Sequence, residues 1–215
     1  MLSNKTIGRL SLYRRAMQEM LADGREYVYS HEIARVCGVT PAQVRRDLMP
    51  TGFTGSPNKG YSIPGLLQNI GRLLDDPEEQ RVALLGVGNL GRAILAYFRG
   101  RRPNLSIVAA FDQDPAKANR VILGCRCHPI EELPAVVKGQ GVEVAILAVP
   151  AASAQTIADQ LIASGVRGLL NFAPVSLRVP SDVYVEDLDM AISLERVAYF
   201  ARHGVSGRRT ERAIR

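Results

Sequence analysis

The sequence predicts an α/β protein with two domains, an N-terminal winged helix-turn-helix and a C-terminal Rossmann domain with a doubly wound parallel sheet. Three observations favour this architecture. Two helical segments flank a short turn that contains Gly38. A Gly-x-Gly-x-x-Gly turn, residues 86–91, joins an apolar strand to a helix. From residue 81 onward, apolar strands alternate with helices, which is typical of a parallel sheet covered on both faces.

The first 75 residues carry four predicted helices and a glycine-rich segment. Apolar side chains recur at helical spacing in residues 6–23, 30–36, 41–48 and 64–74. Ser30 is the expected N-cap of the second helix. Thr40 and Pro41 suit the start of the third, and Gln43 completes a capping box with Thr40. Residues 52–63 are rich in Gly, Ser, Pro and Asn, so we expect a β-hairpin there, the wing.

The acidic, polar segment 75–79 is the predicted linker between the two domains. Six strands and four helices are expected beyond it, followed by a basic, flexible tail. The predicted strands are residues 82–87, 107–112, 121–123, 142–149, 168–172 and 183–185. The predicted helices are residues 89–99, 130–138, 153–164 and 189–203.

Charge is distributed unevenly along the chain. Residues 1–74 hold ten Lys and Arg against five Asp and Glu, residues 75–199 hold twelve against fifteen, and residues 200–215 hold five against one. The basic excess therefore lies outside the glycine turn. This asymmetry indicates a nucleic-acid-binding module joined to a sensor or enzyme module.

The composition is that of a globular protein, and we expect a cytoplasmic one. Apolar residues make up 47% and charged residues 22% of the chain, which excludes a disordered polymer. No apolar run approaches the ~18 residues that span a bilayer, and residues 1–10 lack a signal-peptide core. Cys37, Cys125 and Cys127 form no metal or disulfide pattern, so we expect buried thiols, with a redox switch as the alternative.

The glycine turn predicts a dinucleotide site. Gly86 permits the tight turn, Gly88 lets the backbone approach a pyrophosphate, and Gly91 lets helix and strand pack closely. Asp112 ends the next strand, 21 residues after Gly91, near the offset of the carboxylate that binds the adenosine ribose. Such a carboxylate repels a 2′-phosphate and favours NAD(H) over NADP(H). The alternative is that Asp112 is only a turn residue in Asp-Gln-Asp-Pro.

No catalyst accompanies this site. About thirty residues follow the last predicted strand, too few for a substrate domain. The three histidines, His31, His128 and His203, stand in no Ser/His/Asp or metal-ligand pattern. Tyr97 is followed by Phe-Arg-Gly-Arg, which departs from the Tyr-x-x-x-Lys pair of short-chain reductases. We therefore expect no catalytic residue, no metal ligand and no enzyme activity.

The third predicted helix offers a candidate DNA-reading face. It exposes Gln43, Arg45 and Arg46, and Arg can read guanine and Gln can read adenine. A solvated basic helix face is the alternative, which the helix-turn-helix context disfavours. Lys59 and Tyr61 on the wing are expected to touch phosphates or the minor groove.

Six motifs are shared with one known family. They are Val44-Arg-Arg-Asp-Leu48, Gly60-Tyr61, Gly86-Val-Gly-Asn-Leu-Gly-Arg92, Phe111-Asp-Gln-Asp-Pro115, Asn171-Phe-Ala-Pro174 and Val185-Glu-Asp-Leu-Asp189. Through them the chain resembles the Rex redox-sensing transcriptional repressors over nearly its full length. The resemblance implies a homodimer that binds a palindromic double-stranded DNA operator, that NADH releases, and that NAD+ allows to bind.

The resemblance also assigns segments and residues. It implies a winged-helix domain over 1–76, a Rossmann domain over 77–188 and a helix over 189–205 exchanged between subunits, before the tail 206–215. It implies that Arg15, Tyr97 and Asp189 form a polar cluster that responds to the nicotinamide; structural roles such as surface ion pairing are the alternative. The predicted NADH or NAD+ contacts are Gly86, Val87, Gly88, Asn89, Leu90, Gly91, Tyr97, Asp112, Val149, Pro150, Asn171, Phe172, Ala173, Pro174 and Asp189. The predicted DNA contacts are Ser30, Gln43, Arg45, Arg46, Lys59 and Tyr61, with Arg15 as the coupling residue.

Three positions depart from the family pattern. Met49-Pro50-Thr51-Gly52 stands where the family has Ser-Tyr-Phe-Gly, and Pro50 is expected to end the helix early. Pro57-Asn58-Lys59-Gly60 lacks the usual Arg-Gly pair of the wing, and Lys59 supplies the charge instead. Met190 stands where an aromatic residue often follows Asp189.

Two other classes of function stay open on the sequence. One is a small NAD-dependent oxidoreductase with a basic N-terminal domain. The other is a sensor of a different nucleotide, such as coenzyme A, because CoA-binding Rossmann domains share a similar glycine turn.

Overall fold

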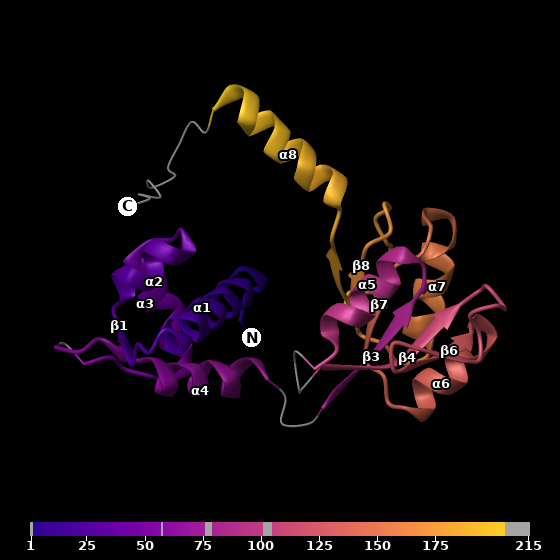
Figure 1. The fold of residues 1–215 in the computed structure, drawn as a ribbon, viewed down its shortest axis with the longest axis horizontal. Helices are drawn as coiled ribbons and strands as arrows, with labels where there is room; N and C mark the ends of the chain where they lie inside the picture. Colours follow the sequence, from indigo (N-terminus) through magenta and orange to yellow (C-terminus); the bar gives the residue numbers. More distant parts are fainter. Residues whose placement is uncertain (1, 57, 76–78, 101–104, 205–215) are drawn as a thin grey trace. The chain divides into compact units, whose positions relative to one another are not determined.

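The computed structural model describes residues 2–56, 58–75, 79–100 and 105–204, and the chain divides into two compact units (Figure 1). The first unit contains the residues up to Asp75, and the second runs from Asp76 to Arg202. Most of the predicted linker, the whole predicted tail and Pro57 of the predicted wing lie outside the described residues.

The first unit is a helix-turn-helix with a small two-stranded sheet. Its elements are α1 (Asn4–Ala22), β1 (Tyr27–Val28), α2 (Ser30–Cys37), α3 (Pro41–Leu48), the 3-10 turn η1 (Met49–Thr51), β2 (Tyr61–Ser62) and α4 (Ile63–Leu74). The four predicted helices are confirmed to within two residues at each end. Gly38 has a φ of 68°, the left-handed conformation that the turn between α2 and α3 requires. The α-helix ends before Pro50, as expected.

The helix caps differ in part from the prediction. Ser30 is the first residue of α2 and not its cap, because the backbone N–H of Tyr29 already donates to the Glu32 carboxylate at 2.8 Å. Thr40 caps α3 by accepting the N–H of Gln43 at 3.2 Å. The Gln43 side chain does not return this bond. Its Nε2 donates to Asp47 Oδ1 at 2.8 Å, so the capping box is incomplete.

The wing also differs from the predicted hairpin over 52–63. Strand β2 pairs antiparallel with β1, with Tyr27 opposite Ser62 and Val28 opposite Tyr61. Ser56 and Gly60 form an isolated bridge. Strand β1 could not be predicted, because two residues are too few to show a period.

Among the residues that the structure describes, the first unit has an apolar interior into which one carboxylate is buried. Each of its helices turns one apolar face inward, as the helical spacing predicts. The most deeply buried side chains are Leu10, Tyr13, Met17, Val28, Ile33, Val44, Leu48, Ile63, Leu66 and Ile70. Asp47 is buried among them, and only 3% of its surface is exposed.

The second unit is a seven-stranded sheet with helices on both faces. Its strands are β3 (Gln80–Leu85), β4 (Leu105–Asp112), β5 (Arg120–Ile122), β6 (Cys125–Pro129), β7 (Val144–Leu147), β8 (Gly168–Asn171) and β9 (Tyr184–Asp187), in the spatial order β5-β6-β4-β3-β7-β8-β9. Its helices are α5 (Asn89–Phe98), the 3-10 turn η2 (Ile130–Glu132), α6 (Leu133–Gly139), α7 (Ala151–Ala163) and α8 (Met190–His203). All neighbouring strands are parallel except β5 and β6. The sequence reading missed β6, because Cys-Arg-Cys-His-Pro lacks a continuous apolar run.

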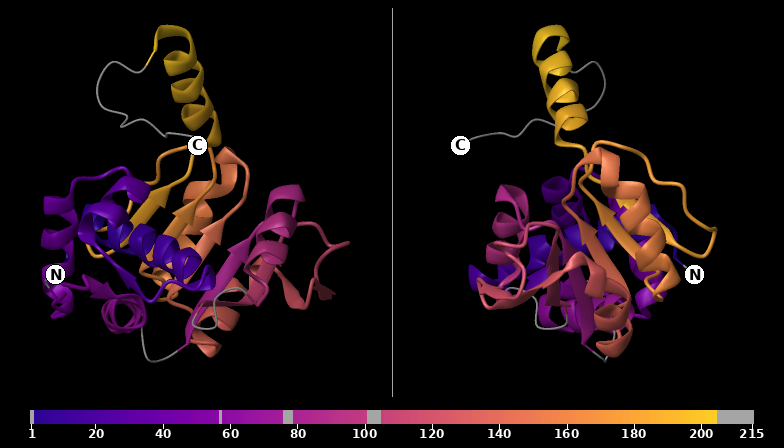
Figure 2. Two further views of the ribbon diagram at one scale, coloured as in Figure 1. Left: turned by 60° about the vertical axis from the view of Figure 1, so that its left-hand side comes forward. Right: turned by 90° about the vertical axis from the view of Figure 1, so that its right-hand side faces the viewer.

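The residues of β3 face the two helical layers alternately. Ala83 and Leu85 belong to the apolar cluster that includes α6 and α7, whereas Val82 and Leu84 belong to the cluster that includes α5. This is the alternation that a strand requires. The central helices therefore cover both faces of the sheet (Figure 2), and the predicted doubly wound α/β fold is confirmed.

Two of the three cysteines are buried, and the third is half-buried. Cys125 and Cys127 are buried, as expected, and burial raises the pKa of Cys125 to about 11. Cys37 is only half-buried, on α2.

Helix α8 differs from the others because none of its residues is buried. It exposes the large apolar side chains of Met190, Ile192, Leu194, Val197, Tyr199 and Phe200. An exposed apolar surface of this kind indicates an interaction site. None of the described helices combines the length and apolar character that crossing a bilayer requires.

Candidate functional site

The glycine turn between β3 and α5 leaves no room for a side chain at two of its three glycines. Gly86 has a φ of 89°, and a Cβ there would lie 2.4 Å from the backbone oxygen of Ala148. A Cβ on Gly91 would lie 2.0 Å from the backbone oxygen of Gly86. At Gly88 nothing lies within 4 Å of an added Cβ. The chain itself does not require a glycine at this position, but a pyrophosphate close to the backbone would.

Asp112 holds this turn from the end of β4. Its Oδ2 accepts the backbone N–H of Val87 at 2.7 Å and the Lys117 ammonium at 3.1 Å, and its Oδ1 accepts the N–H of Asp114 at 2.9 Å. Burial opposes ionisation, but these hydrogen bonds outweigh it, so the pKa of Asp112 lies below its usual value. Asp112 therefore holds the turn, and these bonds do not decide between the two interpretations. Its contact with a ribose stays a prediction.

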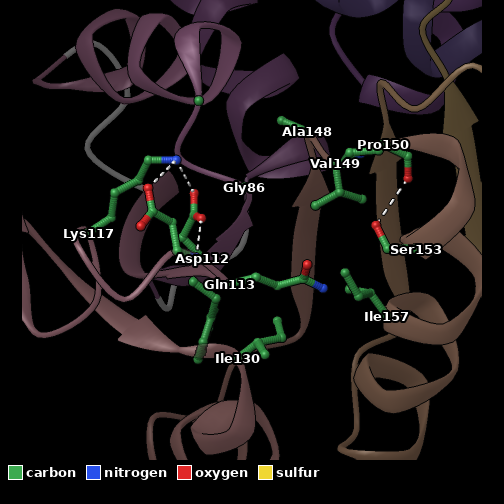
Figure 3. A pocket seen from close by; sticks show the side chains of 13 residues that line it. Gly86, Asp112, Gln113, Lys117, Ile130, Ala148, Val149, Pro150, Ser153 and Ile157 are labelled. Carbon is green, nitrogen blue, oxygen red and sulfur yellow. Dashed lines mark hydrogen bonds and ion pairs between the residues drawn. The ribbon is translucent and has the colours of Figure 1, made fainter.

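A cavity of about 470 Å³ lies at the carboxyl ends of β3, β4 and β7. Figure 3 shows Asp112 and Lys117 on one side of it and Val149, Pro150 and Ser153 on the other. Doubly wound sheets bind their ligands at this edge. The lining residues are Gly86, Gly88, Phe111, Asp112, Gln113, Asp114, Lys117, Ile130, Ala148, Val149, Pro150, Ser153 and Ile157.

Five of the predicted cofactor residues thus meet around one cavity, and Val87, Asn89, Leu90 and Gly91 form the adjoining turn and first turn of α5. The other lining residues were not among the predicted contacts; they are Phe111, Gln113, Asp114, Lys117, Ile130, Ala148, Ser153 and Ile157. The position of Gln113 directly after β4 was an available signal. Lys117 and Ile130 come from later segments, and only the tertiary structure shows that they reach the cavity.

The lining fits an adenine dinucleotide. The ionised Asp112 suits ribose hydroxyls, and the start of α5 at Asn89 suits a pyrophosphate. The apolar side chains of Ile130, Val149 and Ile157 suit a flat ring.

The other predicted cofactor residues lie outside this lining. Asn171 ends β8 and is 1% exposed, and Phe172, Ala173 and Pro174 follow it in the loop at the same edge of the sheet. Their contact with a cofactor stays a prediction.

The predicted polar cluster is spread over both units. Tyr97 lies on α5, where its ring packs edge-on against Phe98. Asp189 precedes α8, and its Oδ1 accepts the N–H groups of Ala191 and Ile192 at 2.8 and 3.1 Å. Arg15 is exposed on α1 of the first unit, so its contact with the other two stays a prediction.

The candidate DNA face lies on α3 and the wing. Arg45 and Arg46 are exposed on α3, and Arg45 Nη1 donates to the Ser30 hydroxyl at 3.1 Å. Gln43 was predicted to be exposed, but it is half-buried, because its side-chain amide donates a hydrogen bond to Asp47. On the wing, the Lys59 ammonium lies 5.7 Å from the centre of the Tyr27 ring. Tyr61 is half-buried on β2.

Asp47 fixes α3 to the core, a role that sequence reasoning missed. It accepts hydrogen bonds from Arg9 Nη2 at 2.7 Å, the Tyr13 hydroxyl at 2.9 Å and Gln43 Nε2 at 2.8 Å. Burial opposes its ionisation, but these bonds hold the pKa of Asp47 below its usual value. The face that carries Arg45 and Arg46 is thereby held in one orientation.

A winged helix-turn-helix joined to a dinucleotide-type Rossmann domain defines the class of ligand-responsive DNA-binding regulators. Two family models match the chain: a putative DNA-binding protein N-terminus over residues 1–48 and a CoA-binding domain over residues 77–175. The redox-sensing transcriptional repressor Rex of Syntrophobacter fumaroxidans is 38% identical over 93% of this chain and 95% of its own. Rex of Anoxybacillus flavithermus is 40% identical over 92% of this chain and 93% of its own. The chain belongs to the Rex family of redox-sensing transcriptional repressors.

Solved structures of a Rex-family repressor are similar to this chain over nearly its full length. The Rex-family repressor RSP in complex with NAD+ and operator DNA is 29% identical, with a TM-score of 0.87 over 94% of each chain. RSP in complex with NADH has a TM-score of 0.84 at 29% identity, over 94% of this chain and 95% of that one. The resemblance stated from the six motifs is confirmed.

Proposed function

We propose that this chain is an NADH-responsive transcriptional repressor, not an enzyme, which binds a palindromic operator as a homodimer and is released by NADH. The observation that carries the proposal is the open position at Gly88 beside an ionised Asp112, in a chain that also bears an exposed Arg45 on a recognition helix. The relatives named as repressors, and the RSP complexes with NAD+, NADH and operator DNA, support it. A repressor of this kind acts in the cytoplasm, where the operator DNA lies.

The two oxidation states share the ADP half, so the glycine turn and Asp112 bind both alike. Discrimination then comes from the nicotinamide. The oxidised ring is a cation, and burying an unpaired charge is costly, whereas the reduced ring is neutral. NADH binding reorients the two recognition helices, whose half-sites must lie one helical turn or a multiple apart.

The dimer uses α8. Its exposed apolar side chains, centred on Leu194 and Val197, need a partner, and exchange of α8 between two copies supplies one.

The test is operator binding measured by fluorescence anisotropy at fixed salt, with NADH and NAD+ titrated separately. We expect NADH to release the DNA and NAD+ to leave it bound. By linkage, operator DNA weakens NADH binding by the same factor. Retention of DNA at saturating NADH would contradict the proposal.

The CoA-binding family model favours one other candidate, a sensor of a coenzyme A nucleotide. A thermal-shift panel of NADH, NADPH and CoA separates the two. We expect NADH to raise the melting temperature most, since the Asp112 carboxylate repels both the 2′-phosphate of NADPH and the 3′-phosphate of CoA.

A further inference from the structure

The amide of Asn171 is engaged on both of its polar atoms. Its Nδ2 donates to the backbone oxygen of Val175 and to Asp187 Oδ1, both at 2.8 Å, and its Oδ1 accepts the N–H of Ala173 at 3.0 Å. Both amide hydrogens are used, and the residue is 1% exposed. The Asn171 side chain therefore holds the loop 172–175 through hydrogen bonds and has no amide hydrogen left to donate to a ligand.

Asp187 lies beside Asn171 on the neighbouring strand β9, in register with it. The backbone oxygen of Asn171 accepts the N–H of Leu188 at 2.8 Å. The next residue, Asp189, accepts the N–H groups of Ala191 and Ile192 in the first turn of α8. Asn171 thus joins the loop 172–175 on one side to the start of α8 on the other.

The strand order indicates which part of a dinucleotide this loop meets. Asp112, the predicted ribose ligand, ends β4, the glycine turn follows β3, and Val149 and Pro150 follow β7. Strand β8 is next along the same edge. A dinucleotide laid from β4 across β3 brings its nicotinamide toward the ends of β7 and β8.

We propose that Asp187 is a positioning residue for the nicotinamide half of the site: through Asn171 it fixes the loop 172–175 and links this loop to α8. The inference rests on the proposed function and adds to it a residue that touches neither the ADP half nor the glycine turn. Without the Asp187 acceptor, one Asn171 N–H loses its partner and the loop is held less firmly.

The experiment compares the affinities of the full chain for NADH and ADP-ribose by calorimetry. ADP-ribose reports the ADP half alone. In Asp187→Val, whose β-branched side chain suits a strand, we expect NADH to bind about 2- to 10-fold more weakly, the range of one hydrogen bond partly shared with solvent. The affinity for ADP-ribose stays unchanged. Asp187→Asn keeps an acceptor oxygen and restores NADH binding. Glu186→Ala is the matched control, because it removes a carboxylate from the opposite face of β9.

A double-mutant cycle shows whether Asp187 acts through Asn171. In the Asn171→Ala background, Asp187→Val should have no further effect on NADH affinity. Equal losses for NADH and ADP-ribose, failure of Asp187→Asn to rescue, or additive losses in the double variant would each overturn the proposal. So would wild-type NADH affinity in Asp187→Val. If instead the unsubstituted chain ignores NADH, the proposed function itself has failed.

Discussion

The carboxylate of Asp112 accepts the backbone N–H of Val87 at 2.7 Å, so the residue that closes β4 also holds the glycine turn after β3. The same carboxylate accepts the N–H of Asp114 and pairs with Lys117. A ribose hydroxyl would add to a group that is already ionised and oriented. The geometry of the turn therefore depends on the same side chain that is the predicted ribose ligand.

Replacing Asp112 with alanine should lower the binding affinities for NADH and for NAD+ by the same factor. The Val87 N–H loses its acceptor and the predicted ribose contact is lost, together about 1–3 kcal/mol. Calorimetric titration measures both affinities. Operator binding by the cofactor-free chain should not change, and Asp182→Ala, which removes a carboxylate paired with Arg167, is the control. A loss confined to NADH would contradict this role.

Alanine at the glycines should separate folding from binding. In Gly91→Ala the new Cβ meets the Gly86 oxygen at 2.0 Å, so the melting temperature should fall. In Gly88→Ala nothing of the chain is within 4 Å, so the melting temperature should hold while NADH affinity falls. Calorimetric melting and NADH titration of the two variants test this contrast. Normal NADH binding by Gly88→Ala would contradict a pyrophosphate at that position.

The glycine turn shows why part of the site was predictable. Its spacing specifies a local strand-turn-helix, and the two apolar periods beside it identify β3 and α5 directly. Lys117 and Ile130 could not be predicted, since they reach the cavity through the packing of later segments. The prediction that Ser30 caps α2 was wrong. Tyr29 and Glu32 form the hydrogen bond at the start of this helix, and residue propensity alone does not show which pair forms it. Strand β1 pairs only through the distant β2, a contact that local patterns do not encode.

Asp47 should make the stability of the chain sensitive to acid. Its pKa is depressed in the folded chain, so its contribution is complete above its unfolded-state value of about 3.9 and is lost as the pH falls through the lower, folded value. The free energy of unfolding should therefore fall more steeply below about pH 4 in the unsubstituted chain than in Asp47→Asn. Denaturant unfolding from pH 7 to pH 2 measures both slopes. Identical slopes would mean that the Arg9 and Tyr13 hydrogen bonds do not favour the charged form.

Arg45→Ala should weaken specific operator binding by about 1–3 kcal/mol if Arg45 reads a base. The variant should keep its fold, because Arg45 is exposed and its bond to Ser30 is a surface contact. Arg72→Ala on α4 removes the same charge away from α3 and is the control. Anisotropy with operator and scrambled DNA distinguishes the two roles. An equal loss on both sequences would make Arg45 a phosphate contact instead.

A charge placed on α8 should dissociate the dimer. Val197 and Leu194 are 66% and 68% exposed and lie on one side of the helix, so a second copy must cover them if the dimer forms there. In Val197→Glu, dimerisation would bury an unpaired carboxylate, and sedimentation should show monomers at concentrations where the unsubstituted chain is dimeric. Operator affinity should fall with it, because a monomer holds one half-site and loses the effective concentration that links the two. Glu195→Gln is the control, since it leaves the apolar side chains in place. If Val197→Glu remained dimeric, the dimer interface would have to lie elsewhere on the chain.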